Sequence, residues 1–107
     1  RSKGVLIMGS GNMVHNLGML NWGSPNAGFD WAQEINGVFI KHLQNGDHKA
    51  LIEFEKLGTA AKLAIPTPDH YFPLLYTLGL QGKNESVSIF NNELQMGSIS
   101  MTSVRFG

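Results

Sequence analysis

The sequence predicts an α/β fold, in which a central mixed sheet is flanked by helices. Three observations predict this class. Residues 4–8 contain a short apolar run bounded by glycines, which is typical of a strand buried on both faces of a parallel sheet. Several later segments repeat apolar residues at spacings of three and four, as amphipathic helices do. Two segments near the C-terminus alternate apolar and polar residues, which is the pattern of half-buried strands.

The predicted strand at residues 4–8 determines the expected domain organisation. A central strand needs a hydrogen-bonded neighbour on each side, and only three residues precede this one. We therefore expect residues 1–107 to be the C-terminal portion of a larger single domain, in which an N-terminal half supplies the missing neighbours.

The composition excludes several classes of function. The 107 residues hold eight Lys or Arg and eight Asp or Glu, so the formal net charge is zero. Nucleic-acid binding and polybasic membrane anchoring need clustered positive charge, and we expect neither. The absence of cysteine excludes thiolate metal sites and thiol catalysis. No apolar run approaches the roughly 20 residues of a membrane span, so we expect a cytoplasmic protein without a membrane segment.

The first predicted helix begins at a capping box formed by Asp30 and Gln33. It ends at Asn45-Gly46, two residues that tolerate the left-handed backbone of a helix end. A single apolar stripe runs along it. The stripe consists of Trp31, Ile35, Val38, Phe39 and Leu43.

Two further helices are expected before residue 80. One follows a cap at Asp47 and closes at Gly58, and the other covers about residues 71–78. Residues 59–65 fit either a short helix or an extended connection. Beyond these helices, the alternating segments 87–90 and 98–104 are predicted to be strands joined through a turn at Asn91-Asn92.

The four histidines are the side chains whose ordinary pKa lies near neutrality, so they are the first candidates for chemistry. His42 and His48 lie in polar segments and are expected to be surface residues. His15 follows the predicted buried strand in a glycine-rich loop, where α/β sheets bind ligands. His70 lies between a rigid proline segment and a helix start, where a neutral imidazole is favoured. A purely structural role fits each of these two equally well, and two histidines alone make a weak metal signature.

Residues 9–14 also resemble the dinucleotide-binding pattern of three small residues after a strand. Val14 occupies the third small position, where a side chain crowds the contact between helix and strand. The segment that follows contains Pro25 and does not look like a crossover helix. Nucleotide binding is therefore a poor match to the sequence.

Two long motifs resemble a known family in the same order along the chain. Residues 4–17, with the sequence GVLIMGSGNMVHNL, resemble a motif of the class III extradiol ring-cleavage dioxygenases, specifically the DOPA 4,5-dioxygenase-like branch. Residues 64–75, with the sequence AIPTPDHYFPLL, resemble the second signature of that branch. Residues 97–107 are similar to its closing strand.

The resemblance implies a non-haem iron(II) site, which zinc can also occupy. In such a site the metal holds a catechol by its two oxygens beside O₂, and the ring opens to a muconic semialdehyde-type product. His70 matches a metal-ligand position of the family. His15 matches the histidine assigned as acid or base, and it also counts as a metal-site residue. The enzyme hypothesis thus predicts that the two side chains converge on one pocket.

The resemblance also implies that the site is incomplete within these residues. The family's other metal-ligand histidines lie in an N-terminal half, and His42 and His48 do not match them. We expect that half to be the required partner of this chain, together with a catechol-type molecule and O₂, and we expect the chain alone to be inactive. The alternative is a non-catalytic α/β remnant or interaction module, in which both candidate histidines are structural.

Overall fold

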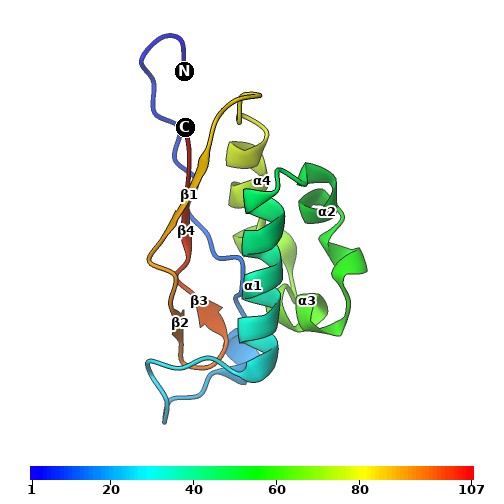
Figure 1. Cartoon of the computed structure of the whole chain (residues 1–107). Coiled ribbons are helices and arrows are strands. Elements are labelled where there is room, and N and C mark those ends of the chain that lie inside the picture. Colours follow the sequence, from blue (N-terminus) through cyan, green and yellow to red (C-terminus); the bar gives the residue numbers. More distant parts are fainter.

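The computed structural model describes all residues, 1–107, as four α-helices, three short 3₁₀ helices and four strands (Figure 1). The α-helices are α1 (Asp30–Gln44), α2 (His48–Ile52), α3 (Thr59–Ala64) and α4 (Phe72–Leu78). The 3₁₀ helices are η1 (Leu17–Met19), η2 (Phe54–Leu57) and η3 (Pro68–His70). The strands are β1 (Val87–Phe90), β2 (Leu94–Gln95), β3 (Ile99–Ser100) and β4 (Ser103–Phe106).

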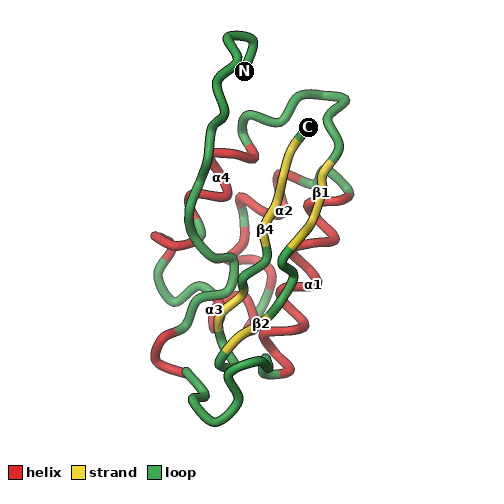
Figure 2. The backbone as a smooth tube through the Cα atoms, turned by 90° about the vertical axis from the view of Figure 1, so that its left-hand side faces the viewer, coloured by secondary structure: helices red, strands yellow, loops and turns green.

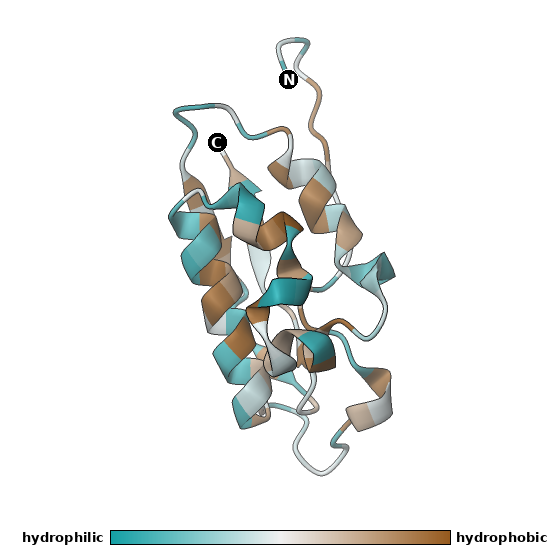
Figure 3. Ribbon diagram, turned by 90° about the vertical axis from the view of Figure 1, so that its right-hand side faces the viewer, coloured by the Kyte–Doolittle hydropathy of each residue, from teal (hydrophilic) through white to brown (hydrophobic).

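Helix α1 lies between a β layer and helices α2 and α3 (Figure 1). The strands form a long hairpin on one side of α1, and α2 and α3 lie on its other side (Figure 1). The predicted apolar stripe of α1 is confirmed, because Ile35, Phe39 and Leu43 are buried. Its outer face is polar (Figure 3). No helix in the structure has both the length and the apolar character needed to cross a membrane.

The start of α1 differs from the predicted capping box. Asp30 is the first helical residue, and Phe29 occupies the cap position without a side-chain hydrogen bond. The carboxamide of Gln33 instead donates to the carbonyl oxygen of Gly28 at 2.8 Å. Asp30 still favours the helix, because its negative charge lies at the positive end of the helix dipole.

The expected second helix is divided into two pieces. Asp47 caps α2 as predicted, accepting a hydrogen bond from the backbone N–H of Ala50. The α-helix ends at Ile52, and the chain continues as η2 up to Gly58, whose φ of 99° suits glycine. Residues 59–65, for which the sequence left two alternatives, contain α3.

Tyr71 is the centre of the core. It is 1% exposed, and its ring lies 4.7 Å from that of Phe54 and 5.5 Å from that of Phe39, measured between centroids. Its hydroxyl donates to the carbonyl oxygen of Leu51 at 2.6 Å. Burial strongly raises the pKa of this hydroxyl, so Tyr71 stays neutral. One side chain thereby joins α1, α2, η2 and the segment that carries His70.

The hairpin turns later than predicted. Strand β1 pairs with β4 and β2 pairs with β3, both antiparallel, so the predicted second strand is divided between β3 and β4. The tight turn contains Met96 and Gly97, both with positive φ, and it connects β2 to β3. Asn91, with a φ of 47°, bends the arm between β1 and β2 and does not close the hairpin. The predicted turn at Asn91-Asn92 was therefore wrong.

The strand predicted at residues 4–8 is absent from this structure. The segment runs beside β4 as an open stretch of chain (Figure 2), and residues 5–11 make no backbone hydrogen bond to any other segment. Its apolar side chains, Val5 to Met8, are between 48% and 84% exposed. A strand exists only where a neighbour completes its ladder, and no segment of these 107 residues does so.

The hydroxyl of Tyr71 supplies a testable contribution to stability. Tyr71→Phe removes the donor to Leu51 and leaves a buried carbonyl unsatisfied, so we expect the free energy of unfolding to fall by about 1 kcal/mol. Urea denaturation measures the change. Tyr76→Phe is the matched control, because Tyr76 is 77% exposed and makes no side-chain hydrogen bond. Equal effects of the two substitutions would contradict this account of the core.

Candidate functional site

The structure brings His15 and His70 into direct contact. Although 55 positions separate them in the sequence, their ring centroids lie 3.6 Å apart with an angle of 17° between the ring planes. His42 and His48 lie elsewhere and are half-buried, which differs from the surface positions expected for them. His42 pairs with the nearby Asp47, and His48 forms a side-chain hydrogen bond with Gln81, 33 positions away.

Backbone hydrogen bonds on two sides hold His15. The backbone N–H of His15 donates to the carbonyl oxygen of Ala64 in α3 at 2.9 Å, and His15 also forms an isolated bridge with Ile99 in β3. The preceding residue, Val14, is completely buried, and its carbonyl oxygen accepts from the N–H of Ser100 at 2.9 Å. The segment is therefore fixed between a helix and a strand, and stacking on His70 places the imidazole.

The proline segment sets the position of His70. Thr67, between the two prolines, is extended with φ −134° and ψ 145°, as the pre-proline constraint predicts. Helix η3 then turns the chain so that His70 is exposed while Tyr71, its neighbour, is anchored in the core. The carbonyl oxygen of His70 accepts from the N–H of Asn12 at 2.7 Å, which ties the two histidine segments together.

Gly9 and Gly11 allow the loop to approach the backbone of η3 and α4. A Cβ on Gly9 would lie 2.7 Å from the carbonyl oxygen of Pro73, and one on Gly11 would overlap the carbonyl oxygen of His70. These contacts explain the glycines without a nucleotide. Val14 is buried in the core, and η1, of three residues, follows the loop where a dinucleotide fold has a crossover helix. The structure therefore gives no support to nucleotide binding.

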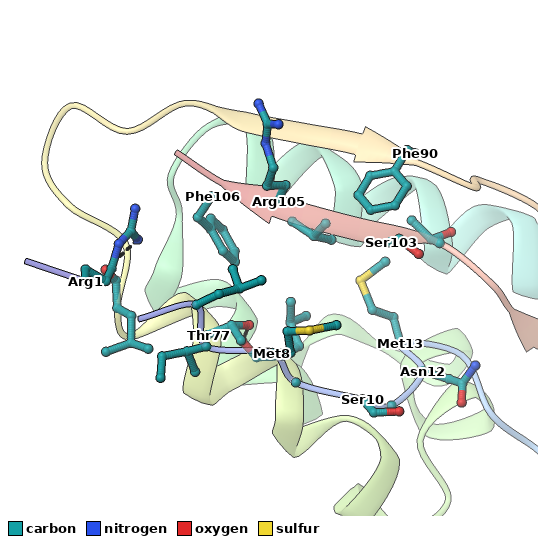
Figure 4. Close-up of a pocket in the computed structure, with 18 of the residues that line it drawn as sticks. Arg1, Met8, Ser10, Asn12, Met13, Thr77, Phe90, Ser103, Arg105 and Phe106 are labelled. Carbon is teal, nitrogen blue, oxygen red and sulfur yellow. Dashed lines mark hydrogen bonds between the residues drawn. The ribbon is translucent and has the colours of Figure 1, made fainter. Parts of the chain in front are cut away.

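A groove of about 860 Å³ runs beside the histidine pair. The N-terminal segment, residues 4–13, forms one wall and β4 the other, and His70 is among the lining residues. Met13 points from the segment toward β4, and Phe106 points back from β4, whereas Arg105 points away (Figure 4). The exposed surface of the groove is thus mainly apolar, although polar residues such as Arg1, Asn12 and Thr77 also line it.

The surroundings of His15 favour its neutral form. Burial lowers the pKa of His15 from its ordinary value of 6.5, and the neighbouring imidazole of His70 lowers it further. Asp69, which lies 3.5 Å from His70 Nε2, opposes the effect. The hydroxyl of Thr67 donates to Asp69 and lowers the pKa of that carboxyl, so Asp69 is negatively charged at neutral pH.

The pair supplies imidazole nitrogens, which suit iron and zinc, but it does not complete a metal site. No group of three or more His, Cys, Asp or Glu side chains in this chain is arranged to hold a metal ion. A metal bound by an imidazole lies close to the plane of the ring, about 2.0–2.1 Å from the nitrogen for zinc. Because the two rings are stacked and nearly parallel, one ion cannot lie in both planes unless a ring turns.

Comparison with known proteins identifies the family. All of residues 1–107 match the family described as the catalytic LigB subunit of aromatic ring-opening dioxygenase. The chain belongs to this family. It is 36% identical over 112 residues to a 4,5-DOPA dioxygenase extradiol of Escherichia coli (strain K12), and 29% identical over 109 residues to one of Beta vulgaris. A crystal structure of an uncharacterized protein from Escherichia coli K12 matches with a TM-score of 0.90 and 33% identity, over all of this chain.

The chain corresponds to a portion of these relatives. It spans 40% of the length of the Escherichia coli dioxygenase, 39% of the Beta vulgaris one and 45% of the crystallised protein. The predicted α/β class is confirmed. The partial coverage of each relative agrees with the expectation that these residues are a portion of a larger domain, which stays a prediction. The resemblance to the extradiol dioxygenases is also confirmed.

Sequence reasoning missed the residues that hold the pair in place. Asn12, Asn16 and Ser98 make hydrogen bonds to backbone groups of distant segments, and Ser100 joins a network with Asn36 of α1. Short polar residues in loops carry no periodic signal, and their partners lie 47 to 88 positions away. The position of Asn12 and Asn16 within the first family motif was the available clue.

The close approach at Gly11 is testable by substitution. Gly11→Ala places a methyl group against the backbone of His70, so we expect a loss of about 1–3 kcal/mol in the free energy of unfolding. Gly37→Ala is the matched control. Gly37 is an exposed residue of α1 with open space around its Cβ position, so alanine there is expected to stabilise by about 0.5–1 kcal/mol. Opposite signs in denaturant titrations support the packing described.

The neutral state of His15 is testable by NMR titration of the metal-free protein. We expect its imidazole to titrate below pH 6.5, and His70→Gln to raise that pKa because the neighbouring positive charge is removed. Since the unfolded state then binds more protons, this residue's contribution to stability is present above pH 6.5 and is lost as the pH falls through the folded pKa. His42→Gln should leave the titration of His15 unchanged. An unaltered pKa in His70→Gln would contradict the coupling.

Proposed function

We propose that this chain is part of an extradiol dioxygenase catalytic domain that opens the ring of a catechol-type substrate, DOPA or a close relative, with O₂. The observation that carries the proposal is the stacked pair of His15 and His70 beside an apolar groove. Membership of the ring-opening dioxygenase family and the similarity to 4,5-DOPA dioxygenases of Escherichia coli and Beta vulgaris support it.

In this proposal His70 is a ligand of a non-haem iron(II), or of zinc in its place. Its side chain is 45% exposed and it lines the groove, so an ion can reach it. When bound, the metal holds the catechol oxygens and O₂ in one coordination sphere, which removes the entropic cost of bringing two substrates together. His15 also belongs to the metal site, but the stacked arrangement favours ligation by one ring, with the other beside it.

His15 acts as the acid and base. Its lowered pKa keeps a ring nitrogen free to accept a proton from a catechol hydroxyl at neutral pH. Backbone contacts fix the segment of His15 and stacking on His70 places its ring, so the same imidazole can return the proton in a later step. The apolar side chains of the groove suit the apolar part of an aromatic ring.

The remaining metal ligands come, in this proposal, from the part of the family's length that the chain does not span. A working site usually needs at least three protein ligands, and this chain offers two imidazoles. The chain alone is then inactive, and the missing portion of the domain is its obligatory partner. A cytoplasmic location stays a prediction from the sequence.

A chimera tests the proposal. Residues 1–107 replace the aligned region of the Escherichia coli dioxygenase, and DOPA is added with iron(II) and O₂. We expect an O₂-dependent yellow product. His70→Ala should lose both bound metal and product, whereas His15→Gln should keep the metal and turn over about 10²–10⁴ times more slowly.

The same assay of the chimera provides the control and the result that would contradict the proposal. His42→Gln should match the parent chimera, because His42 interacts with Asp47 and lies outside the stacked pair. A chimera that binds metal and turns over normally with His70→Ala would exclude His70 as a ligand. A chimera that is folded but inactive would favour the alternative of a non-catalytic α/β remnant or interaction module.

A further inference from the structure

We propose that Asn12 is the positioning residue that keeps His15 and His70 stacked. The importance of this role for catalysis rests on the proposed function. The stacking of the two histidines does not, because it is present without a metal. Asn12 does not belong to the pair. It acts through the two segments on which the histidines are carried.

The first contact of Asn12 is with the His70 segment. Its backbone N–H donates to the carbonyl oxygen of His70 at 2.7 Å, where the absence of a side chain on Gly11 lets the two backbones meet. This is also the first backbone hydrogen bond after a stretch, residues 5–11, that has none. The loop that leads to His15 is therefore attached to the folded body at Asn12.

The second contact is with the strand that holds His15. The carboxamide Nδ2 of Asn12 donates to the carbonyl oxygen of Ser100 at 2.8 Å. Ser100 also donates its N–H to the carbonyl oxygen of Val14, and its neighbour Ile99 bridges to His15. Asn12 thus contacts the segment of each histidine, once through the backbone and once through the side chain.

These contacts close a ring of interactions. It passes from His15 to β3, from Ser100 of β3 to the side chain of Asn12, from Asn12 to His70, and through the stacked rings back to His15. The carboxamide of Asn12 makes the one side-chain hydrogen bond in this ring, because the other links are backbone contacts and the stacking of the two imidazoles. Substitution of this side chain still allows the backbone hydrogen bond to His70, but it removes the hydrogen bond to Ser100 in β3.

The chemistry of the contact selects the variants. Asn12→Ala removes the donor, and Asn12→Asp keeps the size of the side chain but faces a carboxylate oxygen toward the carbonyl oxygen of Ser100. Gln33→Ala is the matched control. It removes a carboxamide-to-carbonyl hydrogen bond of the same 2.8 Å length, from Gln33 to Gly28, in a different part of the chain.

The experiment measures nuclear Overhauser contacts between the ring protons of His15 and His70 in the metal-free 107-residue chain. We expect these contacts in the parent and in Gln33→Ala, and their loss in both Asn12 variants while the amide spectrum stays dispersed. Persistence of the contacts in Asn12→Ala and Asn12→Asp would overturn the proposal. Collapse of the whole spectrum in both variants would overturn it too, because Asn12 would then be a residue of the fold and not of the pair.

Failure of the positioning role and failure of the proposed function remain distinguishable. The contacts between the two imidazoles are measured in the 107-residue chain without metal or substrate. If the chimera is inactive but the Asn12 variants of this chain lose the imidazole contacts, the positioning role of Asn12 stands and the proposed function fails. Conversely, the chimera can be active while the imidazole contacts persist in Asn12→Ala of the 107-residue chain. The proposed function then stands, and Asn12 is excluded as the positioning residue.

Discussion

The structure depends on the fixing of residues 12–16 between helix α3 and the hairpin. Backbone hydrogen bonds on both edges hold this short segment, although it belongs to no helix or strand of its own. Val14 is entirely buried within it, while His15 is only partly buried and stacks on His70, which lines the groove. An irregular segment with satisfied polar groups can be buried as firmly as a strand, and it can present a side chain in a direction that a regular strand does not allow.

Direct contacts connect the hydrophobic core to the segments that carry the candidate site. Tyr71 anchors the chain one residue after His70, and its hydroxyl reaches the carbonyl oxygen of Leu51 in α2. Ser100 and Asn36 join the hairpin to α1 through a buried hydrogen bond between their side chains. The two histidines are thus carried by segments that the hydrophobic core already orients, so little conformational freedom has to be lost when a ligand arrives.

Sequence patterns predicted what local chemistry determines. The stripe of α1 and the cap at Asp47 follow from spacing and capping, and both were confirmed. Residues 4–8 were misassigned because a strand needs a partner, which no local pattern supplies. The late hairpin turn depended on backbone conformations at Met96 and Gly97 that alternation does not reveal. The contact between the two imidazoles is tertiary and became visible only in three dimensions.

The ring of contacts around the histidines joins remote parts of the polypeptide. The hydrogen bond between Asn12 and Ser100 spans 88 positions, and the contact of Asn16 with Leu63 spans 47. Closing loops of this length costs entropy before any contact compensates for it, so such pairs form late during folding. Contact between the two imidazoles requires segments 55 positions apart to have assembled, so it reports on tertiary folding and not on local structure.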